Sequence, residues 1–521
     1  MRNCQAPLAV APVVLLVGSL LLSMNGCGKS DAKASGTGAA NPGGGAVAAD
    51  ESGVVNKGPN GPAVMKADGT PVDGIKLSQH DLEVDCPSIA VGTDGVIHVA
   101  FVEKHRTTYA LGVYHRSSSD GGKSWSEAKN LSEDMPDINV GKCEVLVDGQ
   151  NRTYVIWRAG LKPTFPASPN ITSTSSCNLW YRVMSADGRW SVIKPVAPPD
   201  ESALQHEGTL SYFAGVDGAG RVQLAFNTFP DHYLHRAVEH TYGPGSGYTV
   251  GPYVGNGLVM QVTLDGANAS PARQAFMTAI SDSPNMGKVC DGLNSLTGYF
   301  DASGTAHFAA AAGNFFTNKP GWHGEVIDGG KISWKLELPD LSFHGYNDVP
   351  TLLTDAKGKQ HLIVLYPTGE RPNVRDYVVG SDDEPTVIRA AKEVDGRVLG
   401  MQAFAGAGGR MAVLMQFNDS GKSGAGDFYV STSDGGAWSE PVNVTNNAGR
   451  SSFHTTQTSM ASHVAVAISY YPGIGAATFD KDGHLLLVMV NNESAIVDSN
   501  ALGVSVAGGS VSTPTLRFLK L

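Results

Sequence analysis

Residues 118–125 read SSDGGKSW and predict a tight turn between two β-strands. The carboxylate of Asp120 can accept hydrogen bonds from nearby backbone N–H groups, as in an Asx-turn. Gly121 and Gly122 permit backbone angles that a side chain would forbid. Trp125 begins the next strand, where its indole can pack beneath the turn. The stretch therefore predicts a turn that one carboxylate and one aromatic ring hold together.

Two further stretches repeat this arrangement. Residues 432–438 read TSDGGAW, one residue short of the same spacing, and residues 185–190 read SADGRW. The pattern Ser-x-Asp-x-Gly-x-x-Trp resembles the Asp-box, or bacterial neuraminidase (BNR) repeat, of sialidase-like β-propellers; the first copy fits it fully and the other two are degenerate. The resemblance implies a propeller and gives a structural role to Ser118, Asp120, Gly122, Trp125, Asp187, Trp190, Asp434 and Trp438.

The chain also repeats on a larger scale. Seven times an apolar run meets a polar or glycine-rich turn and a second apolar run follows, as in residues 89–91 and 96–101. Each pair predicts the two inner strands of a blade, joined by a hairpin. Six of the turns contain an aspartate: Asp94, Asp148, Asp217, Asp301, Asp355 and Asp480. Antiparallel four-stranded blades arranged radially form a β-propeller, so we predict an all-β fold with seven blades. Six blades, the number in the sialidase family, is the alternative.

The composition suits this fold class and excludes one kind of partner. The chain has 521 residues, of which 63 are glycine and only 17% are charged, a texture typical of a large turn-rich β protein. Its formal net charge is −11, and it has no block of Lys or Arg. An acidic chain of this kind binds nucleic acid poorly, so we expect no nucleic-acid partner.

Residues 1–27 have the features of an export signal. Arg2 precedes an apolar run that Pro12 interrupts and that ends near Leu22, and Cys27 follows Gly26. This arrangement resembles a bacterial lipoprotein signal, in which the cysteine is lipidated after cleavage. We therefore expect an exported protein that Cys27 anchors to the outer membrane, the cell surface or the periplasmic face. Ordinary secretion, with cleavage near Gly26, is the alternative.

A tether and a single folded domain follow the signal. Residues 28–70 are rich in Gly and Ala and lack apolar periodicity, which predicts a flexible tether. Residues 71–521 contain all the repeats and form the predicted propeller domain.

Four cysteines lie within the propeller domain: Cys86, Cys143, Cys177 and Cys290. An even number in an exported protein favours disulfides. Cys86 and Cys143 both open the first strand of a repeat, so their pairing is the better prediction, and Cys177 with Cys290 follows by elimination. The spacing does not suggest a zinc site.

The repeats also predict which face of the propeller is functional. If the hairpin turns lie on one face, alternation of the strands puts the Asp-box turns on that same face. The opposite face then receives the beginnings of the inner strands and the loops that leave the second strands; we call it the strand-start face. In sialidase-like propellers that opposite face holds the active site.

Acidic side chains recur at nearly the same position in successive repeats, just where the inner strand begins, and so are expected on the strand-start face. They are Asp85, Glu144, Glu207, Asp291 and Asp348. Of these, Glu207, Asp85 and Glu144 are the candidate catalytic carboxylates. The candidate ligand-binding residues are His206, Asp291, Asp348, His344, Arg106, Arg158, Arg371, Arg375, Tyr470 and Tyr471. The four arginines are expected in the loops that leave the second strands. Like charges around one axis repel unless arginine, a metal ion or a raised pKa offsets them. Oxygen and imidazole ligands suit calcium, manganese or zinc and do not choose among them, and acids that merely cap turns are the structural alternative.

The function is less well specified than the fold. The resemblance implies three substrate-binding arginines, an Asp acid/base and a Tyr activated by a Glu, but the Arg-Ile-Pro type motif that carries the first arginine is missing here, so no catalytic residue is transferred. We predict an exported propeller that binds a glycan at the axis of the strand-start face. The alternatives are a glycoside hydrolase, either sialidase-like or with two carboxylates, a polysaccharide lyase with His206 or a nearby tyrosine as base, and a non-catalytic protein-binding scaffold. If the protein is an enzyme, hydrolysis is favoured over elimination.

Overall fold

The computed structural model describes most of the repeat region. The described residues are 64–65, 71–72, 74–78, 84–104, 111–135, 139–160, 177–196, 211–228, 258–277, 280–283, 287–290, 292–313, 322–338, 350–366, 373–388, 397–418, 426–444, 475–494 and 512–521. The predicted signal, including Cys27, and most of the predicted tether lie outside them. Within the described residues, no helix has the length and apolar character needed to cross a membrane.

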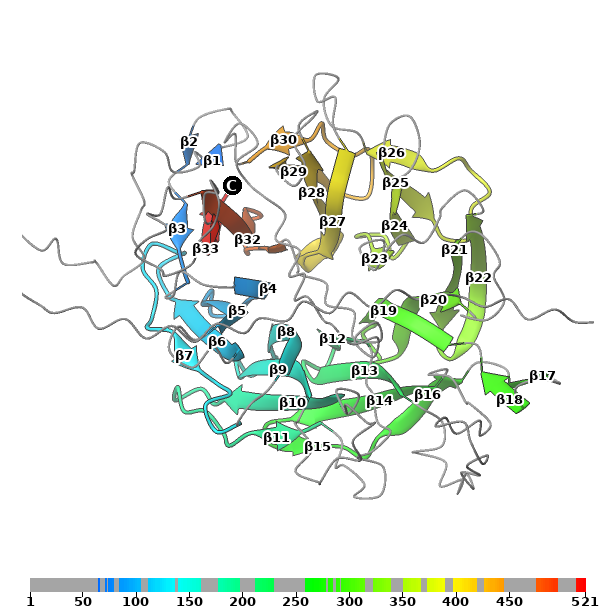
Figure 1. The fold of residues 1–521 in the computed structure, drawn as a ribbon, viewed down its shortest axis with the longest axis horizontal. Coiled ribbons are helices and arrows are strands. Elements are labelled where there is room, and N and C mark those ends of the chain that lie inside the picture. Colours follow the sequence, from blue (N-terminus) through cyan, green and yellow to red (C-terminus); the bar gives the residue numbers. More distant parts are fainter. Residues whose placement is uncertain are drawn as a thin grey trace, which may run out of the picture. The chain divides into compact units, whose positions relative to one another are not determined.

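Seven antiparallel sheets form the blades, and in six of them the strands follow one another along the chain (Figure 1). Blade 1 contains β4 (Val84–Val91), β5 (Ile97–Lys104), β6 (Leu111–Ser118) and β7 (Lys129–Asn130). Blade 2 contains β8 (Asn139–Val147), β9 (Thr153–Gly160), β10 (Cys177–Met184) and β11 (Lys194–Pro195). Blade 3 contains β12 (Tyr212–Val216), β13 (Val222–Thr228), β14 (Leu258–Asp265) and β15 (Asn268–Ala269), with β16 (Arg273–Met277) also pairing with β14.

The second half of the ring repeats the plan. Blade 4 contains β19 (Gly292–Phe300), β20 (Ala306–Gly313), β21 (Trp322–Asp328) and β22 (Lys331–Leu338). Blade 5 contains β23 (Thr351–Thr354), β24 (Gln360–Tyr366), β25 (Asn373–Val378) and β26 (Thr386–Ile388). Blade 6 contains β27 (Arg397–Ala405), η1 (Ala407–Gly409), β28 (Met411–Asn418), β29 (Gly426–Ser433) and β30 (Val442–Asn443). Two small hairpins stand apart from the blades, β1 (Val64–Met65) with β2 (Pro71–Val72) and β17 (Ile280–Ser283) with β18 (Gly287–Cys290).

Blade 7 closes the ring with strands from both ends of the described chain. Its inner strands β31 (Gly475–Phe479) and β32 (Leu485–Ser494) pair in sequence with β33 (Ser512–Lys520), and the outermost strand is β3 (Ile75–Lys76). Ile75 lies opposite Phe518, and Leu77 N donates to Leu516 O at 2.7 Å. The inner strand of each blade contacts that of the next, and β31 contacts β4. The seven-bladed prediction is confirmed, and the six-bladed alternative is wrong.

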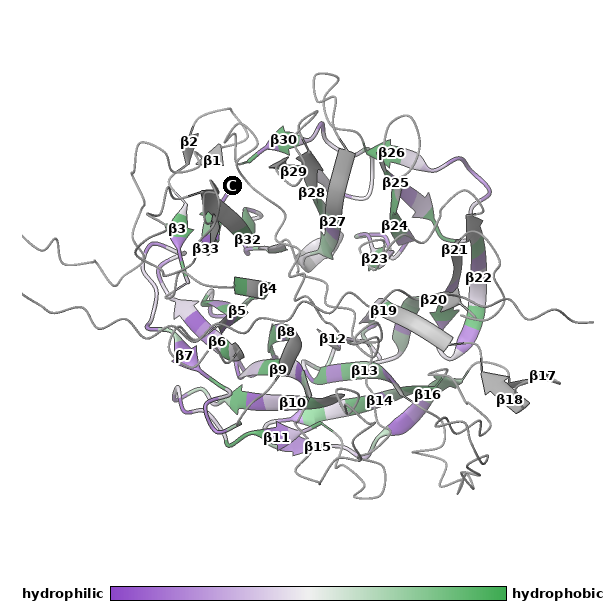
Figure 2. Cartoon of the chain, viewed as in Figure 1, coloured by the Kyte–Doolittle hydropathy of each residue, from purple (hydrophilic) through white to green (hydrophobic). Residues whose placement is uncertain are grey.

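The core lies between the blades. On β5, Ile97, Val99 and Phe101 pack into an apolar cluster shared with blade 7, whereas Ala100 and Val102 pack into one shared with blade 2. Each of the seven blade interfaces has one such cluster, and apolar residues accordingly occur along the blade strands (Figure 2). Period-two alternation therefore puts both faces of a blade in a core.

The aspartates in the hairpin turns share one geometry. Oδ1 of Asp148 accepts hydrogen bonds from the backbone N–H groups two and four residues later, at 2.8 and 2.9 Å. The same pair of bonds forms at Asp217, Asp301, Asp355 and Asp480. The residue three positions after each aspartate has a positive φ and is glycine in all but one turn, where Asn151 has a φ of 57°. These acids are turn residues, which is the role that Asx-turn chemistry predicts for them.

Candidate functional site

The Asp120 turn has the hydrogen bonds expected from its sequence. Oδ1 of Asp120 accepts from the backbone N–H groups of Lys123 and Ser124, both at 2.9 Å. The hydroxyl of Ser124 donates to Oδ2, and that of Ser118 donates to Oδ1. These bonds, those from Ser124 first, hold the pKa of Asp120 well below its ordinary value. A carboxylate that accepts this many hydrogen bonds within its own turn has a structural role and is a poor candidate for a catalytic acid or base.

The three Asp-box tryptophans each contact the third strand of the preceding blade. Trp125 of blade 1 packs edge-on against Phe518 in β33, with ring centroids 5.0 Å apart. Trp190 of blade 2 meets His115 in β6, also at 5.0 Å. Nε1 of Trp438 in blade 6 donates to Oδ2 of Asp376 in β25 at 2.8 Å. The Asp-box turns therefore join neighbouring blades as well as bracing their own.

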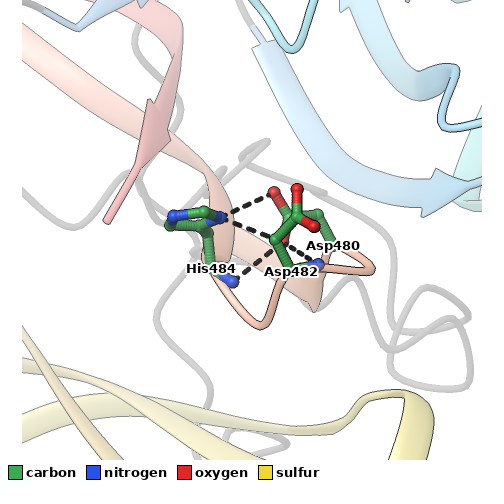
Figure 3. A group of neighbouring side chains, drawn as sticks. All are labelled: Asp480, Asp482 and His484. Carbon is green, nitrogen blue, oxygen red and sulfur yellow. Dashed lines mark hydrogen bonds and ion pairs between the residues drawn. The ribbon is translucent and has the colours of Figure 1, made fainter.

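One group on the hairpin-turn side offers oxygen and imidazole atoms together. Asp480, Asp482 and His484 lie within 4.8 Å of one another by potential ligand atoms, the only such group among the residues that the structure describes (Figure 3). However, Oδ1 of Asp480 accepts the turn N–H bonds shared by the other blades, and Oδ2 accepts from Nζ of Lys520 at 2.7 Å. Turn geometry and an ion pair account for the cluster, and the metal predicted for the strand-start face remains a prediction.

Most of the predicted site residues lie outside the described part of the chain. Asp85 belongs to β4, but its side chain is not among the described ones. Cys177 and Cys290 belong to β10 and β18, likewise without described side chains. The candidates wholly outside the described residues are Glu207, His206, Asp291, Asp348, His344, Arg106, Arg371, Tyr470 and Tyr471.

Two arginines predicted for loops lie in strands instead. Arg158 is inside β9, opposite Lys142 of β8, and is only 4% exposed. Arg375 is inside β25, between Val364 and Val387 of the neighbouring strands. The loop assignment is wrong for both, because each strand continues its alternating pattern through the arginine. Arg158 stays near the strand-start end of blade 2, whereas Arg375 belongs to the third strand of blade 5.

The structure brings Glu144 and Arg158 together with two residues that were not predicted. Nζ of Lys142 lies 2.5 Å from Oε1 of Glu144 and donates to the carbonyl oxygen of Tyr212 at 2.9 Å. It also lies 4.3 Å from the centre of the Tyr212 ring, a cation–π distance. Lys142, Glu144, Arg158 and Tyr212 form what we call the blade 2–3 cluster, because Tyr212 opens the first strand of blade 3.

The blade 2–3 cluster has a distinct electrostatic character. Burial, followed by the charge of Glu144, raises the pKa of Tyr212 well above its ordinary value, although Arg158 lowers it. The phenol is therefore neutral and donates to the carbonyl oxygen of Ile156 at 3.3 Å. Oε2 of Glu144 is buried and has no hydrogen-bond partner among the residues that the structure describes. A buried acceptor without a donor is uncommon in folded proteins.

The two cysteines of the predicted pair are neighbours. Sγ of Cys143 donates to the carbonyl oxygen of Cys86 at 3.0 Å, and the disulfide between them stays a prediction. Cys86 has a φ of 49° and lies where the β4–β5 register shifts. At this bulge the Cys86 carbonyl oxygen faces Cys143.

A signal for Lys142 was present in the sequence, whereas none existed for its contact with Tyr212. Lys142 stands two residues before Glu144 in the same strand, so the two side chains share a face. Tyr212 lies 70 residues away, and only the packing of blade 3 on blade 2 brings it to Lys142. The same packing makes Tyr212 a buried residue of this interface.

Comparison with known proteins shows likeness in shape only. No protein-family model matches the sequence, and no curated protein matches it. Similar solved structures include a polysaccharide lyase, Uly1, with 9% identity, a TM-score of 0.40, and coverage of 69% of this chain and 78% of that chain. An α-L-arabinofuranosidase of Fusarium graminearum in complex with arabinobiose has 9% identity, a TM-score of 0.39, and coverage of 86% and 97%. A NanB sialidase from Streptococcus pneumoniae has 10% identity, a TM-score of 0.37, and coverage of 86% and 70%. At such similarity these activities are properties of those proteins and are not transferred to this chain.

Proposed function

We propose that this protein is an exported propeller that binds a glycan at its strand-start face, with Glu144 accepting hydrogen bonds from the sugar hydroxyls. The observation that carries the proposal is the second carboxylate oxygen of Glu144, which has no partner among the described residues, while the first is paired with Lys142. Leaving such an acceptor unsatisfied costs about 1–3 kcal/mol. A hydroxyl donor supplied by a ligand would recover that free energy.

The neighbours of Glu144 fit a polyhydroxyl ligand. The Glu144 side chain is 21% exposed, so a hydroxyl group of a ligand can approach the carboxylate from the surface. Lys142, which is 41% exposed, places an ammonium donor beside this acceptor. An adjacent donor and acceptor complement vicinal hydroxyl groups, each of which both donates and accepts.

Replacing Glu144 with glutamine is expected to weaken binding of the recognised glycan by about tenfold, equivalent to one charge-assisted hydrogen bond of about 1.4 kcal/mol. The amide keeps the shape of the carboxylate but removes its charge and one acceptor oxygen. A glycan array with the unmodified protein identifies the ligand, and calorimetry then compares the dissociation constants.

Glu325→Gln is the matched control, because Glu325 also pairs with a lysine, Lys335, at 3.0 Å, but on the outer strands of blade 4. It should leave binding unchanged. Equal affinity of Glu144→Gln and the unmodified protein, or an array with no bound glycan, would contradict the proposal. A parallel panel of chromogenic sugars and uronates tests the hydrolase and lyase alternatives, because turnover would make the bound glycan a substrate.

The export part of the proposal rests on the residues around Cys27. In a bacterial host, the full chain is expected to incorporate labelled palmitate and to sediment with membranes. Cys27→Ser should abolish both, and Cys4→Ser, a change to a cysteine within the signal, should abolish neither. Palmitate incorporation that persists in Cys27→Ser would show that Cys27 is not the lipidated residue.

A further inference from the structure

A buried histidine in blade 5 stands between two carboxylates. His361 in β24 is 5% exposed, and its Nδ1 lies 2.9 Å from Oδ1 of Asp376 in β25. Its Nε2 lies 3.6 Å from Oδ2 of Asp355, in the turn before β24. Asp376 also accepts from the indole N–H of Trp438 at 2.8 Å. We call these four residues the His361 cluster; it links blade 5 to the Asp-box turn of blade 6.

The protonation state of His361 decides how many of these contacts form. A neutral imidazole has one N–H and can donate to Asp376 alone, whereas an imidazolium can donate to Asp376 and also form an ion pair with Asp355, at the 3.6 Å separation of Nε2 and Oδ2. The side chains of Asp355 and Asp376 are 0% and 5% exposed, and two buried carboxylates with a neutral histidine would leave an uncompensated charge. Burial alone lowers the pKa of His361, but the hydrogen bonds and charges of Asp376 and Asp355 outweigh it, and the pKa is raised above 6.5.

Among the described residues, the largest electrostatic influences on the His361 imidazole come from its own blade. Asp355 and Asp376 are the charged groups that act on His361 from its own blade. Blade 6 presents the indole of Trp438 and the backbone of Gly435, on which a Cβ would lie 2.7 Å from Oδ2 of Asp355. The adjacent Asp434 is paired with Arg410 at 2.7 Å.

Blade 4 contains the same triad without the link to another blade's tryptophan. His307 lies between Asp301 and Asp328, at 3.2 and 2.8 Å. The two carboxylates of this triad are more exposed than those beside His361, with Asp301 at 38% and Asp328 at 33%. Asp328 accepts from Gln360 of blade 5 instead of an indole. His307 is therefore an internal control for an Asp–His–Asp triad.

We propose that His361 is a proton-dependent contact between blades 5 and 6: as the imidazolium it holds Asp355 and Asp376 together, Asp376 holds Trp438, and loss of its proton as the pH rises loosens this blade interface. Because the folded-state pKa is raised, the stabilisation is fully present below 6.5 and is lost as the pH rises through the folded-state value. The interface would then open more readily as the pH rises above the folded-state pKa of His361.

Hydrogen exchange across pH 6 to 9, corrected for intrinsic rates, tests this proposal on the full chain. We expect the amides of β25 and β29 to lose protection as the pH rises in the unmodified protein. In His361→Gln these amides should be poorly protected at every pH, so their protection should not change. In His307→Gln, the amides of β25 and β29 should still lose protection as the pH rises. An imidazole titration of His361 by NMR gives a second measurement that does not depend on the variant's folding. A midpoint at or below 6.5, or the same pH dependence in His361→Gln and the unmodified protein, would overturn the proposal.

Discussion

Replacing Phe518 with alanine is expected to lower the free energy of unfolding by about 3–5 kcal/mol, the cost typical of truncating a buried phenylalanine. Phe518 is 3% exposed, and its ring packs against Trp125 of blade 1. A Cβ at Gly122 would lie 2.2 Å from the Phe518 ring, which shows how closely the Asp-box turn approaches it. The residue also pairs with Ile75 of β3. Phe518→Ala therefore removes packing at the seam where the two ends of the described chain close the ring.

Urea unfolding followed by circular dichroism measures this effect. Val192→Ala is the control, because Val192 is 71% exposed and its truncation should change stability by less than about 0.5 kcal/mol. A loss below about 1 kcal/mol for Phe518→Ala would show that the seam does not limit stability. A blade that unfolds separately would appear as a second transition.

Acidification from pH 6.5 to about 4 is expected to destabilise the protein by an amount on the order of 5 kcal/mol, through two buried histidines. His98 and His115 stack with ring centroids 5.4 Å apart, and Nδ1 of His98 lies 3.1 Å from Nε2 of His115. Burial lowers the pKa of His98 to about 4, although Asp94 raises it slightly. Burial, with the neighbouring His98, lowers the pKa of His115 to about 3.

The sign of this effect follows from proton uptake. The unfolded chain binds protons at these histidines below pH 6.5, whereas the folded chain stays neutral until about pH 4, so stability falls as the pH falls between those values. His361 does not make stability depend on pH in this range, because its pKa is raised and its stabilising effect is fully present below pH 6.5. Asp301 and Asp480, with pKa values lowered to about 2, lose their contribution chiefly below 3.8.

The double variant His98→Gln/His115→Gln should unfold in urea with a much smaller pH slope between 6.5 and 4. His484→Gln is the control, because the His484 side chain is 49% exposed and should keep the slope of the unmodified protein. An unchanged slope in the double variant would assign the acid sensitivity to other groups. Trp190, which meets His115 edge-on, offers a fluorescence signal for the same transition.

Local chemistry explains which predictions about the fold succeeded. The Asx-type bonds of Asp120 and of the hairpin aspartates join residues two to four positions apart, and the blade hairpins join strands that follow one another along the chain. Such contacts join residues that lie close together along the chain, so a single sequence is enough to predict them. The prediction that Arg158 and Arg375 lie in loops was wrong for the opposite reason, because the true ends of β9 and β25 depend on the partner strands.

By itself, the sequence determined that this chain is an all-β protein of seven hairpin modules with braced turns, because periodicity and turn chemistry act over a few residues. Only the tertiary structure decided that β3 completes blade 7, that Trp125, Trp190 and Trp438 reach across to the preceding blade, and that Lys142 joins Glu144 to Tyr212. These contacts bring together groups from tens to hundreds of residues apart. The packing of whole blades around the ring decides which of these groups meet, and local sequence patterns do not encode that packing.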